Sequence, residues 1–438
     1  MRFSSSPSLW AKIFSNQLKD LHAHLVSNSN CGPRVTYYVS LWPIGGIALK
    51  QFIRHATIVF PDRVVTNCDM LIENGLICAV GCNLPDDSDS NSCCFSEDIL
   101  IPGLIDTHVH GAGGYDIMDG TAESLAALSQ ALLREGTTAF LGTTLSSSVD
   151  RLLTILETIH TGRTDVIHSN QAQLLGVHLE GPFLTTEYKG AHVGEYIPPS
   201  IPGRDLAILT RLVNAYPSLI RILTFAIDRI DTTDLIAFCQ SHGIIPAAGH
   251  TAADYTAMSR AAVAGVHRIT HAFNAMPGIH HRQPGPVTEG LLNADIELEI
   301  IADGIHIHPA ILEMVFRLKP QDKITLVSDG TRSVGMPDGE YELGGQITTV
   351  KNGIARLSDG TIAGSAYSLL QGIRTMVQVL NRPLHEAVRF ASLNPARSLG
   401  VADRLGSLES GKDATFVRLS SNLTVKQVWL QGKIVVEG

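Results

Sequence analysis

Five short apolar runs in this sequence each end in a histidine or a carboxylate, the residue types that bind metals and transfer protons. The runs end as Ile105-Asp-Thr-His-Val-His110, Gly176-Val-His-Leu-Glu180, Pro246-Ala-Ala-Gly-His250, Ile269-Thr-His271 and Leu326-Val-Ser-Asp329. A divalent ion such as zinc needs imidazole nitrogens and carboxylate oxygens that converge from several directions. We therefore predict a metal bound by Glu180, His250 and His271, with Asp329 as the group that transfers protons.

Each histidine taken alone has a plainer interpretation as a hydrogen-bonded structural side chain. The joint occurrence outweighs that interpretation, because five separate strand ends would otherwise have acquired such residues independently. His178 lies on the opposite side of its strand from Leu179, and we leave it out of the primary site as a packed or supporting residue.

The elements that must position these residues are strands and helices that alternate after Pro102, a texture typical of βα units and a parallel sheet. The expected strands are 104–108, 138–141, 174–180, 220–225, 244–249, 268–271, 298–301 and 324–328. The expected helices include 122–135, 149–160, 206–216, 232–241, 253–264 and 309–318. Eight such units predict a (β/α)₈ barrel of the TIM type, in which active-site residues lie at the carboxyl ends of the strands.

Both ends of the chain have a different sequence pattern. Short β-branched runs separated by turn signals cover 52–80, residues 83–98 are expected to form a surface loop, and 384–399 is expected to be helical. A sequence pattern typical of strands returns in 414–418 and 425–430, and we expect these segments to join the early strands.

The fold class is therefore α/β, a barrel with a small β-sandwich domain built from both chain ends. The expected division is a disordered leader at 1–50, a small β domain at 51–103 and 395–438, and a catalytic barrel at 104–394.

Composition excludes several classes of protein. The hydrophobic fraction is 44% against 17% charged residues, which is typical of a folded globular chain, and the net charge of -9 argues against nucleic acid as a partner. No apolar run reaches the roughly 18 residues of a membrane span. The seven cysteines show no disulfide framework, which favours a cytoplasmic protein.

Two weaker patterns have alternative interpretations. Cys78, Cys82, Cys93 and Cys94 could form a small zinc site, but no paired C-x-x-C appears, so strand and loop thiols are favoured. The basic, Ser-rich leader resembles an organelle transit peptide, although a disordered extension is the favoured interpretation.

Seven motifs together carry a resemblance to a known family. They are Pro102-Gly-Leu-Ile-Asp-Thr-His-Val-His-Gly111, His178-Leu-Glu-Gly-Pro-Phe183, Lys189-Gly-Ala-His192, Gly249-His-Thr251, His271-Ala-Phe-Asn-Ala-Met-Pro277, Ala302-Asp-Gly-Ile-His306 and Val327-Ser-Asp-Gly330. From about Ala56 to its end, the chain resembles the amidohydrolase superfamily and, within it, the N-acetylglucosamine-6-phosphate deacetylases. The resemblance implies metal-dependent hydrolysis of the acetamide of N-acetyl-D-glucosamine 6-phosphate to D-glucosamine 6-phosphate and acetate, in amino-sugar catabolism.

The resemblance also assigns roles to residues. It implies that Glu180, His250 and His271 hold the principal metal, expected to be zinc, and that Asp329 is the catalytic acid and base. Some family members add a second metal through the pair that corresponds to His108 and His110, whereas others have lost the pair. Both histidines are present here, so the sequence allows either one or two bound ions.

For the substrate, the resemblance implies that His192 polarises the acetamide carbonyl. Phosphate binding is implied for Asn274, the Ala275 backbone, Arg282 and His306. The family's arginine at the position of Arg282 reaches the neighbouring subunit's site, which implies a homodimer. The sequence departs from the family at the fourth strand end, Thr224-Phe-Ala-Ile-Asp228, where relatives usually carry Ala-Pro-Glu, and at Tyr367.

Two other functions fit the residues less well. Another amidohydrolase could act on a cyclic amide or an N-acyl amino acid, but such sites commonly use a carboxylated lysine where this chain has Glu180. A non-catalytic barrel that serves as an assembly partner is disfavoured, because the candidate ligands and Asp329 are all intact.

Overall fold

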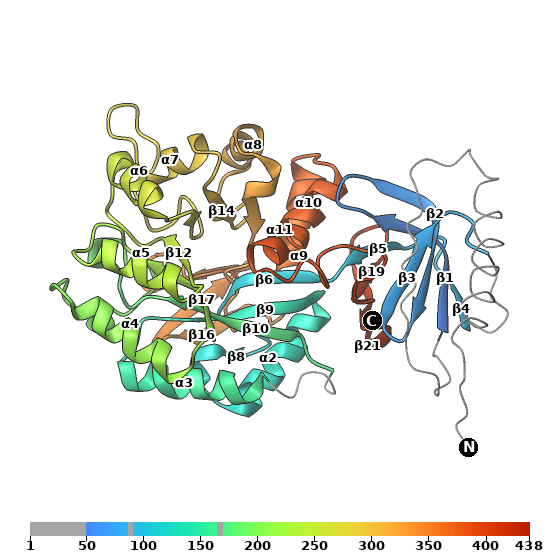
Figure 1. The fold of residues 1–438 in the computed structure, drawn as a ribbon, viewed down its shortest axis with the longest axis horizontal. Helices are drawn as coiled ribbons and strands as arrows, with labels where there is room; N and C mark the ends of the chain where they lie inside the picture. Colours follow the sequence, from blue (N-terminus) through green and yellow to red (C-terminus); the bar gives the residue numbers. More distant parts are fainter. Residues whose placement is uncertain (1–49, 86–90, 164–169) are drawn as a thin grey trace, which may run out of the picture.

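The computed structural model describes residues 50–85, 91–163 and 170–438 of the chain. It shows a barrel surrounded by helices, with a separate sheet beside it that carries the C-terminal strand β21 (Figure 1). The leader expected at 1–50 lies outside the described residues, apart from Lys50. Within the described ranges, none of the helices is both long enough and apolar enough to cross a membrane.

The separate sheet contains strands from both ends of the chain. Its eight strands are β1 (Lys50–Val59), β2 (Val64–Glu73), β3 (Leu76–Gly81), β4 (Asn91–Cys94), β5 (Ile99–Pro102), β19 (Phe416–Leu419), β20 (Val425–Leu430) and β21 (Lys433–Glu437). Antiparallel pairing of β19 with β5 joins the two groups of strands into one continuous sheet. The predicted joining of the early and late strands is thus confirmed.

One expectation for this region is wrong in part, because the loop expected at 83–98 contains β4. This strand of four exposed residues pairs in parallel with β1, between Gln51 and Arg54. Its sequence, Asn-Ser-Cys-Cys, shows no alternation of apolar and polar residues, and no side chain of β4 is buried. The strand forms through its backbone bonds to β1, a long-range contact that its own residues do not signal.

The barrel consists of eight parallel strands in chain order, as predicted. They are β6 (Leu104–Val109), β9 (Thr137–Thr144), β10 (Gln173–Glu180), β11 (Ile220–Phe225), β12 (Ile245–Ala248), β13 (Arg268–Ile269), β14 (Glu297–Ile300) and β15 (Ile324–Leu326). An isolated parallel bridge between Val109 and Gly330 brings the first and last strands together. The fold class, a TIM-type barrel with a β domain from both chain ends, is confirmed.

Helices follow the barrel strands and cover the outside of the sheet (Figure 1). They are α2 (Ala122–Arg134), α3 (Val149–Gly162), α4 (Arg204–Ala215), α5 (Thr232–Ser241), α6 (Tyr255–Ala264), α7 (Pro286–Leu292) and α8 (Pro309–Leu318). Local sequence explains their starts: the side chains of Thr121, Ser148 and Asp254 accept hydrogen bonds from the first-turn amides of α2, α3 and α6. Apolar side chains at helical spacing, such as Leu152, Ile155 and Leu156 on α3, face the barrel core.

The barrel has two interior zones. At one end, Ile105, Leu141 and Ile222 of the strands pack with Leu399 and Leu405 from the segment after the last helix. The polar residues predicted for the site lie at the other end, where the strands finish.

Short elements near the strand ends complete this face. They are β7 (Gly111–Ala112), β8 (Tyr115–Asp116), η1 (Ile117–Asp119), η3 (Thr186–Tyr188) and η4 (Gly194–Tyr196), whereas η5 (Gln321–Lys323) directly precedes β15 at the opposite end of the barrel. After β15 an antiparallel sheet that the sequence pattern did not predict is formed by β16 (Gly339–Leu343), β17 (Gln346–Lys351) and β18 (Ile354–Arg356).

The segment 384–399 is helical, but the prediction of one continuous helix is wrong. After α9 (Leu369–Arg374) and the π-helical η6 (Thr375–Val379), the structure has α10 (Leu384–Phe390) and a separate α11 (Leu393–Ser398). Pro395 explains the break. In a continuous helix the backbone N–H of residue 395 would donate to the carbonyl four residues earlier, but proline has no N–H. In the first turn of α11 that N–H is not required.

Candidate active site

Glu180, His250 and His271 meet at the carboxyl ends of three barrel strands. Glu180 is the last residue of β10, while His250 and His271 each lie two residues beyond β12 and β13. The Glu180 Oε1 atom is 3.1 Å from His250 Nε2 and 3.0 Å from His271 Nε2, and the two imidazole nitrogens are 2.9 Å apart. All three side chains are buried. The structure thus brings the three predicted ligands together.

The chemistry of this group fits a divalent cation. His250 donates its Nδ1 proton to the Tyr188 carbonyl at 2.9 Å, which leaves the Nε2 lone pair facing Glu180 and His271. Two imidazole nitrogens and a carboxylate oxygen at such distances form a buried cluster of lone pairs, and a positive charge satisfies all of them.

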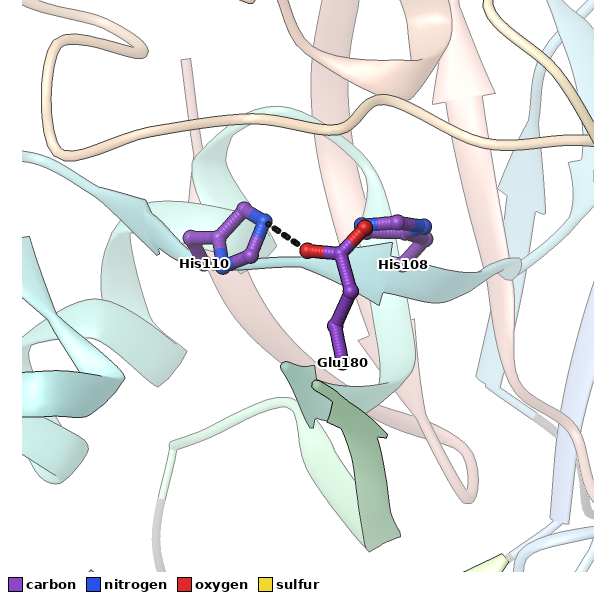
Figure 2. A group of neighbouring side chains, drawn as sticks. All are labelled: His108, His110 and Glu180. Atoms are coloured by element: carbon purple, nitrogen blue, oxygen red, sulfur yellow. Dashed lines mark ion pairs between the residues drawn. The ribbon is translucent and has the colours of Figure 1, made fainter. Parts of the chain in front are cut away.

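The predicted second pair, His108 and His110, faces the same carboxylate. Figure 2 shows Glu180 reaching between the two rings, with an ion pair from its Oε2 atom to His110 Nε2 at 3.3 Å. His108 Nε2 lies 3.4 Å from Glu180 Oε1. Glu180 therefore borders both groups of histidines. Burial alone would lower the pKa of His110, but Asp329 and Glu180 outweigh it and raise the pKa to about 9.

Asp329 lies three residues beyond β15 and points toward the same two histidines. Its Oδ1 atom is 3.2 Å from His110 Nε2 and 3.4 Å from His108 Nε2. Burial alone would raise the pKa of Asp329, but the neighbouring imidazoles outweigh it and lower the pKa to about 2. The carboxylate is therefore ionised at neutral pH and is able to accept a proton.

His192 has a defined proton arrangement. The backbone N–H of Ser146 donates to His192 Nδ1 at 3.0 Å, so the ring proton lies on Nε2. This Nε2 is 3.3 Å from Glu180 Oε2, beside the candidate ligands. Burial lowers the pKa of His192 to about 4, so the ring is neutral near pH 7 and can donate a hydrogen bond.

Several residues of the site have left-handed backbone conformations, which are uncommon outside glycine. The φ angles are 48° at His250, 27° at His271 and 48° at Asp329, with 50° at Ala275. Each costs of the order of 1 to 3 kcal/mol and persists where the surrounding structure enforces it, which is typical of functional sites.

A cavity of about 420 Å³ opens over these groups. The predicted residues on its wall are His110, Glu180, His192, His250, His271, Asn274, Ala275, His306 and Asp329. His306 donates its Nδ1 proton to Asp303 at 2.7 Å; burial opposes a positive ring, but this carboxylate outweighs it and raises the pKa of His306. A cavity of this size suits a small-molecule substrate.

Two predicted site residues are not on this wall: His108, which is fully buried beside Glu180, and Arg282. Arg282 lies exposed in the loop between His271 and α7, where its Nη1 atom donates to His281 Nε2 at 2.7 Å. Residues that sequence reasoning did not single out also line the cavity, among them Lys189, Leu343, Asp359 and Thr361. Lys189 belonged to a quoted motif, whereas the others come from the unpredicted sheet and the loop that follows it.

The atypical fourth strand end has a structural role beside the site. The Asp228 carboxylate accepts hydrogen bonds from the Thr185 hydroxyl at 2.6 Å, from the Thr251 hydroxyl and from the Ala252 amide at 3.1 Å. Thr185 in turn donates its backbone N–H to the His250 carbonyl at 3.0 Å. Asp228 therefore joins the loops on both sides of His250.

A parallel barrel with a buried glutamate and histidine cluster at its carboxyl ends defines a metal-dependent hydrolase class, and the comparisons with known proteins agree. The Amidohydrolase family model matches residues 99–435. The chain belongs to the amidohydrolase family and, within it, to the N-acetylglucosamine-6-phosphate deacetylases. The resemblance seen in the motifs is thereby confirmed.

Relatives from several organisms support this assignment. The N-acetylglucosamine-6-phosphate deacetylase of Vibrio furnissii is 38% identical over 340 residues, which cover 77% of this chain and 83% of the relative. That of Bacillus subtilis is 37% identical over 390 residues, with 89% and 98% covered. An Escherichia coli relative at 36% identity, covering 77% of this chain and 88% of its own, is an N-acetylgalactosamine-6-phosphate deacetylase.

Solved structures agree with these sequences. A variant of the deacetylase of Mycobacterium smegmatis, in complex with N-acetyl-D-glucosamine-6-phosphate, has a TM-score of 0.81 at 29% identity and covers 89% of this chain and all of its own. The deacetylase of Thermotoga maritima has a TM-score of 0.78 at 31% identity, with the same coverage.

Proposed function

We propose that this protein hydrolyses the acetamide of N-acetyl-D-glucosamine 6-phosphate, releasing acetate and D-glucosamine 6-phosphate, and needs a divalent metal. The observation that carries the proposal is the convergence of Glu180, His250 and His271 beside the ionised Asp329, in one cavity. Relatives at 37% and 38% identity that have this activity support the choice of substrate.

Glu180, His250 and His271 would hold the principal ion. Zinc suits this set because it accepts imidazole and carboxylate ligands in a site of low coordination number. When bound, such an ion supplies Lewis-acid chemistry: it polarises a carbonyl oxygen and lowers the pKa of water from 15.7 toward about 7. His108 and His110, on the other side of Glu180, would hold a second ion.

Asp329 is proposed as the group that transfers protons. Because its pKa is lowered to about 2, it is a carboxylate at neutral pH and can take a proton from the attacking water. Once protonated, the same oxygen can return the proton to the leaving amine, so one residue serves as base and then as acid.

His192 is proposed to contact the acetamide carbonyl. The Ser146 amide holds the ring with its proton on Nε2, the atom nearest the ligand cluster. A neutral Nε2–H donor can bind the carbonyl oxygen and stabilise negative charge that develops on it.

The phosphate would lie at the other end of the cavity, against Asn274, the Ala275 backbone and His306. The raised pKa of His306 favours a positive ring, which attracts a phosphate. Arg282 lies on an exposed loop, and we propose that it completes the phosphate site of a second copy in a homodimer. Phosphate contacts remote from the breaking bond would orient the sugar.

Acetate release from matched substrates tests the proposed function. The zinc-loaded protein should release acetate from N-acetylglucosamine 6-phosphate, much less from the unphosphorylated sugar, and none after a chelator removes the metal. N-acetylgalactosamine 6-phosphate belongs in the same assay, because one relative acts on that epimer. No acetate from either phosphorylated sugar in a metal-replete sample overturns the proposal.

A further inference from the structure

The barrel interior contains a buried arginine that the reaction as proposed does not use. Arg268 of β13 is 1% exposed, and its Nε and Nη1 atoms form ion pairs with Glu299 Oε1 at 2.7 Å and Glu297 Oε1 at 3.0 Å. Removing charges from water costs several kcal/mol per ion, and a well-packed apolar pair is often equally stable. Such a network therefore calls for a role besides stability.

Glu299 connects this arginine to the candidate metal centre. While Oε1 accepts from Arg268, Oε2 accepts from His108 Nδ1 at 3.1 Å and faces the His271 backbone N–H at 3.3 Å. Arg268 also donates to the Thr107 hydroxyl at 2.8 Å, next to His108 in the chain. Both ends of the ion pair thus contact the segment that carries His108.

The consequence lies in the orientation of His108. Because Glu299 accepts the Nδ1 proton, the Nε2 atom points toward Glu180 and Asp329, 3.4 Å from a carboxylate oxygen of each. This buried Nε2 has no hydrogen-bond partner within the described ranges. A ligand histidine held by a carboxylate through its other nitrogen has a fixed ring and a more basic ligand atom.

Glu299 distinguishes His108 from the other candidate ligands. His110 and His250 donate their Nδ1 protons to the neutral carbonyls of Thr143, at 3.2 Å, and Tyr188, at 2.9 Å. Among the histidines that surround Glu180 in the described structure, His108 is the one whose Nδ1 proton is held by a carboxylate.

A separate metal site formed by His108, His178 and Glu299 is the alternative, since their ligand atoms lie within 4.8 Å of one another. Hydrogen bonds already satisfy this group, however. His178 Nδ1 donates to the Thr107 carbonyl at 2.9 Å, and its Nε2 accepts from the Thr224 hydroxyl at 2.7 Å. The arrangement therefore favours a supporting network over a second centre.

We propose that Glu299, held in place by Arg268, is a positioning residue that makes His108 a metal ligand and so determines whether a second ion binds beside Glu180. The inference rests on the metal centre of the proposed function.

The same strand offers a matched control for a test. Glu297 also pairs with Arg268, but its carboxylate otherwise accepts hydrogen bonds from Ser398 and Thr325, which lie outside the histidine cluster. Glu299→Gln and Glu297→Gln therefore remove the same charge from the same arginine, and the first alone changes the contact with His108.

Zinc titration with elemental analysis of the dialysed protein measures the outcome. Wild type and Glu297→Gln should bind two ions per chain. Glu299→Gln should keep the ion of Glu180, His250 and His271 and bind the second about 10- to 100-fold more weakly, the usual effect of losing such a partner. A cobalt-loaded sample should show the same loss in its visible spectrum.

A variant without the ion pairs guards against misfolding. Arg268→Met with Glu297→Gln and Glu299→Leu removes all three charges of the network, so no carboxylate is left without its arginine. The metal-free protein should unfold near the wild-type melting temperature and still lose the second ion.

Two results overturn the inference alone: equal affinity for the second ion in Glu299→Gln and Glu297→Gln, or a wild type that binds one ion and releases acetate. Wild-type protein that binds no zinc and releases no acetate overturns the proposed function as well.

Discussion

Replacing Asp329 by asparagine should slow turnover without removing the principal metal. The carboxylate oxygen Oδ1 lies 3.2 Å from His110 Nε2, whereas the three principal ligand atoms come from Glu180, His250 and His271. Asparagine has nearly the same shape, but its amide cannot take a proton at neutral pH. The substitution therefore removes proton transfer while the metal ligands stay in place.

The size of the effect follows from the assigned role. A positioned acid or base contributes about 10² to 10⁴ in rate, which corresponds to about 2.7 to 5.4 kcal/mol of activation free energy. Because the pKa of Asp329 is lowered to about 2, essentially every wild-type molecule has the carboxylate at pH 7, so the variant should show the full loss.

The assay is acetate release at saturating N-acetylglucosamine 6-phosphate, with zinc measured in the same samples. Asp359→Asn is the matched control, because Asp359 lines the same cavity outside the ligand cluster. A kcat for Asp329→Asn within tenfold of this control would refute the proton-transfer role. Loss of the principal zinc ion in the variant would show instead that Asp329 is a ligand.

Three further predictions concern other residues. Arg282→Ala should raise KM for the phosphorylated sugar at least tenfold and leave the slow reaction of the unphosphorylated sugar unchanged. If the variant and the wild type have the same KM for the phosphorylated sugar, Arg282 does not bind the phosphate. His192→Gln should lower kcat by about 10² to 10³ with its zinc retained, as expected for loss of one oxyanion donor, and unchanged kcat would contradict that role. Burial and the neighbouring His108 lower the pKa of His178 from 6.5 to about 3. Between these two pH values the unfolded chain binds a proton that the folded chain does not, so the free energy of unfolding falls as the pH falls from 6.5 toward 3, by at most about 1.36 kcal/mol per pH unit. Urea unfolding of metal-free wild type and His178→Gln between pH 7 and 4.5 should show this difference in slope, and parallel curves would contradict it.

The barrel and its ligand residues could be predicted because both depend on local pattern. Strands buried on both faces are mostly apolar, as in Ile220–Phe225, where only Arg221 and Thr224 are polar, and the structure has that strand with the same limits. A polar residue at the end of such a run, such as Glu180, is placed at the mouth of the barrel by topology alone.

Features that depend on long-range contacts could not be predicted. The charges of Arg268 and Glu299 resemble ordinary surface charges in the sequence, and their pairing across two strands inside the barrel is a tertiary property. The proton position on His192 likewise depends on the Ser146 amide, 46 residues away. The strands β16 to β18 are short and partly exposed, so their pattern is weak.

Anomalous diffraction at the zinc absorption edge tests the central claim most directly. Crystals of the active, zinc-loaded protein should show a strong peak bounded by Glu180 Oε1, His250 Nε2 and His271 Nε2. Absence of a peak among these three atoms in crystals of an active sample would contradict the assignment of the metal centre.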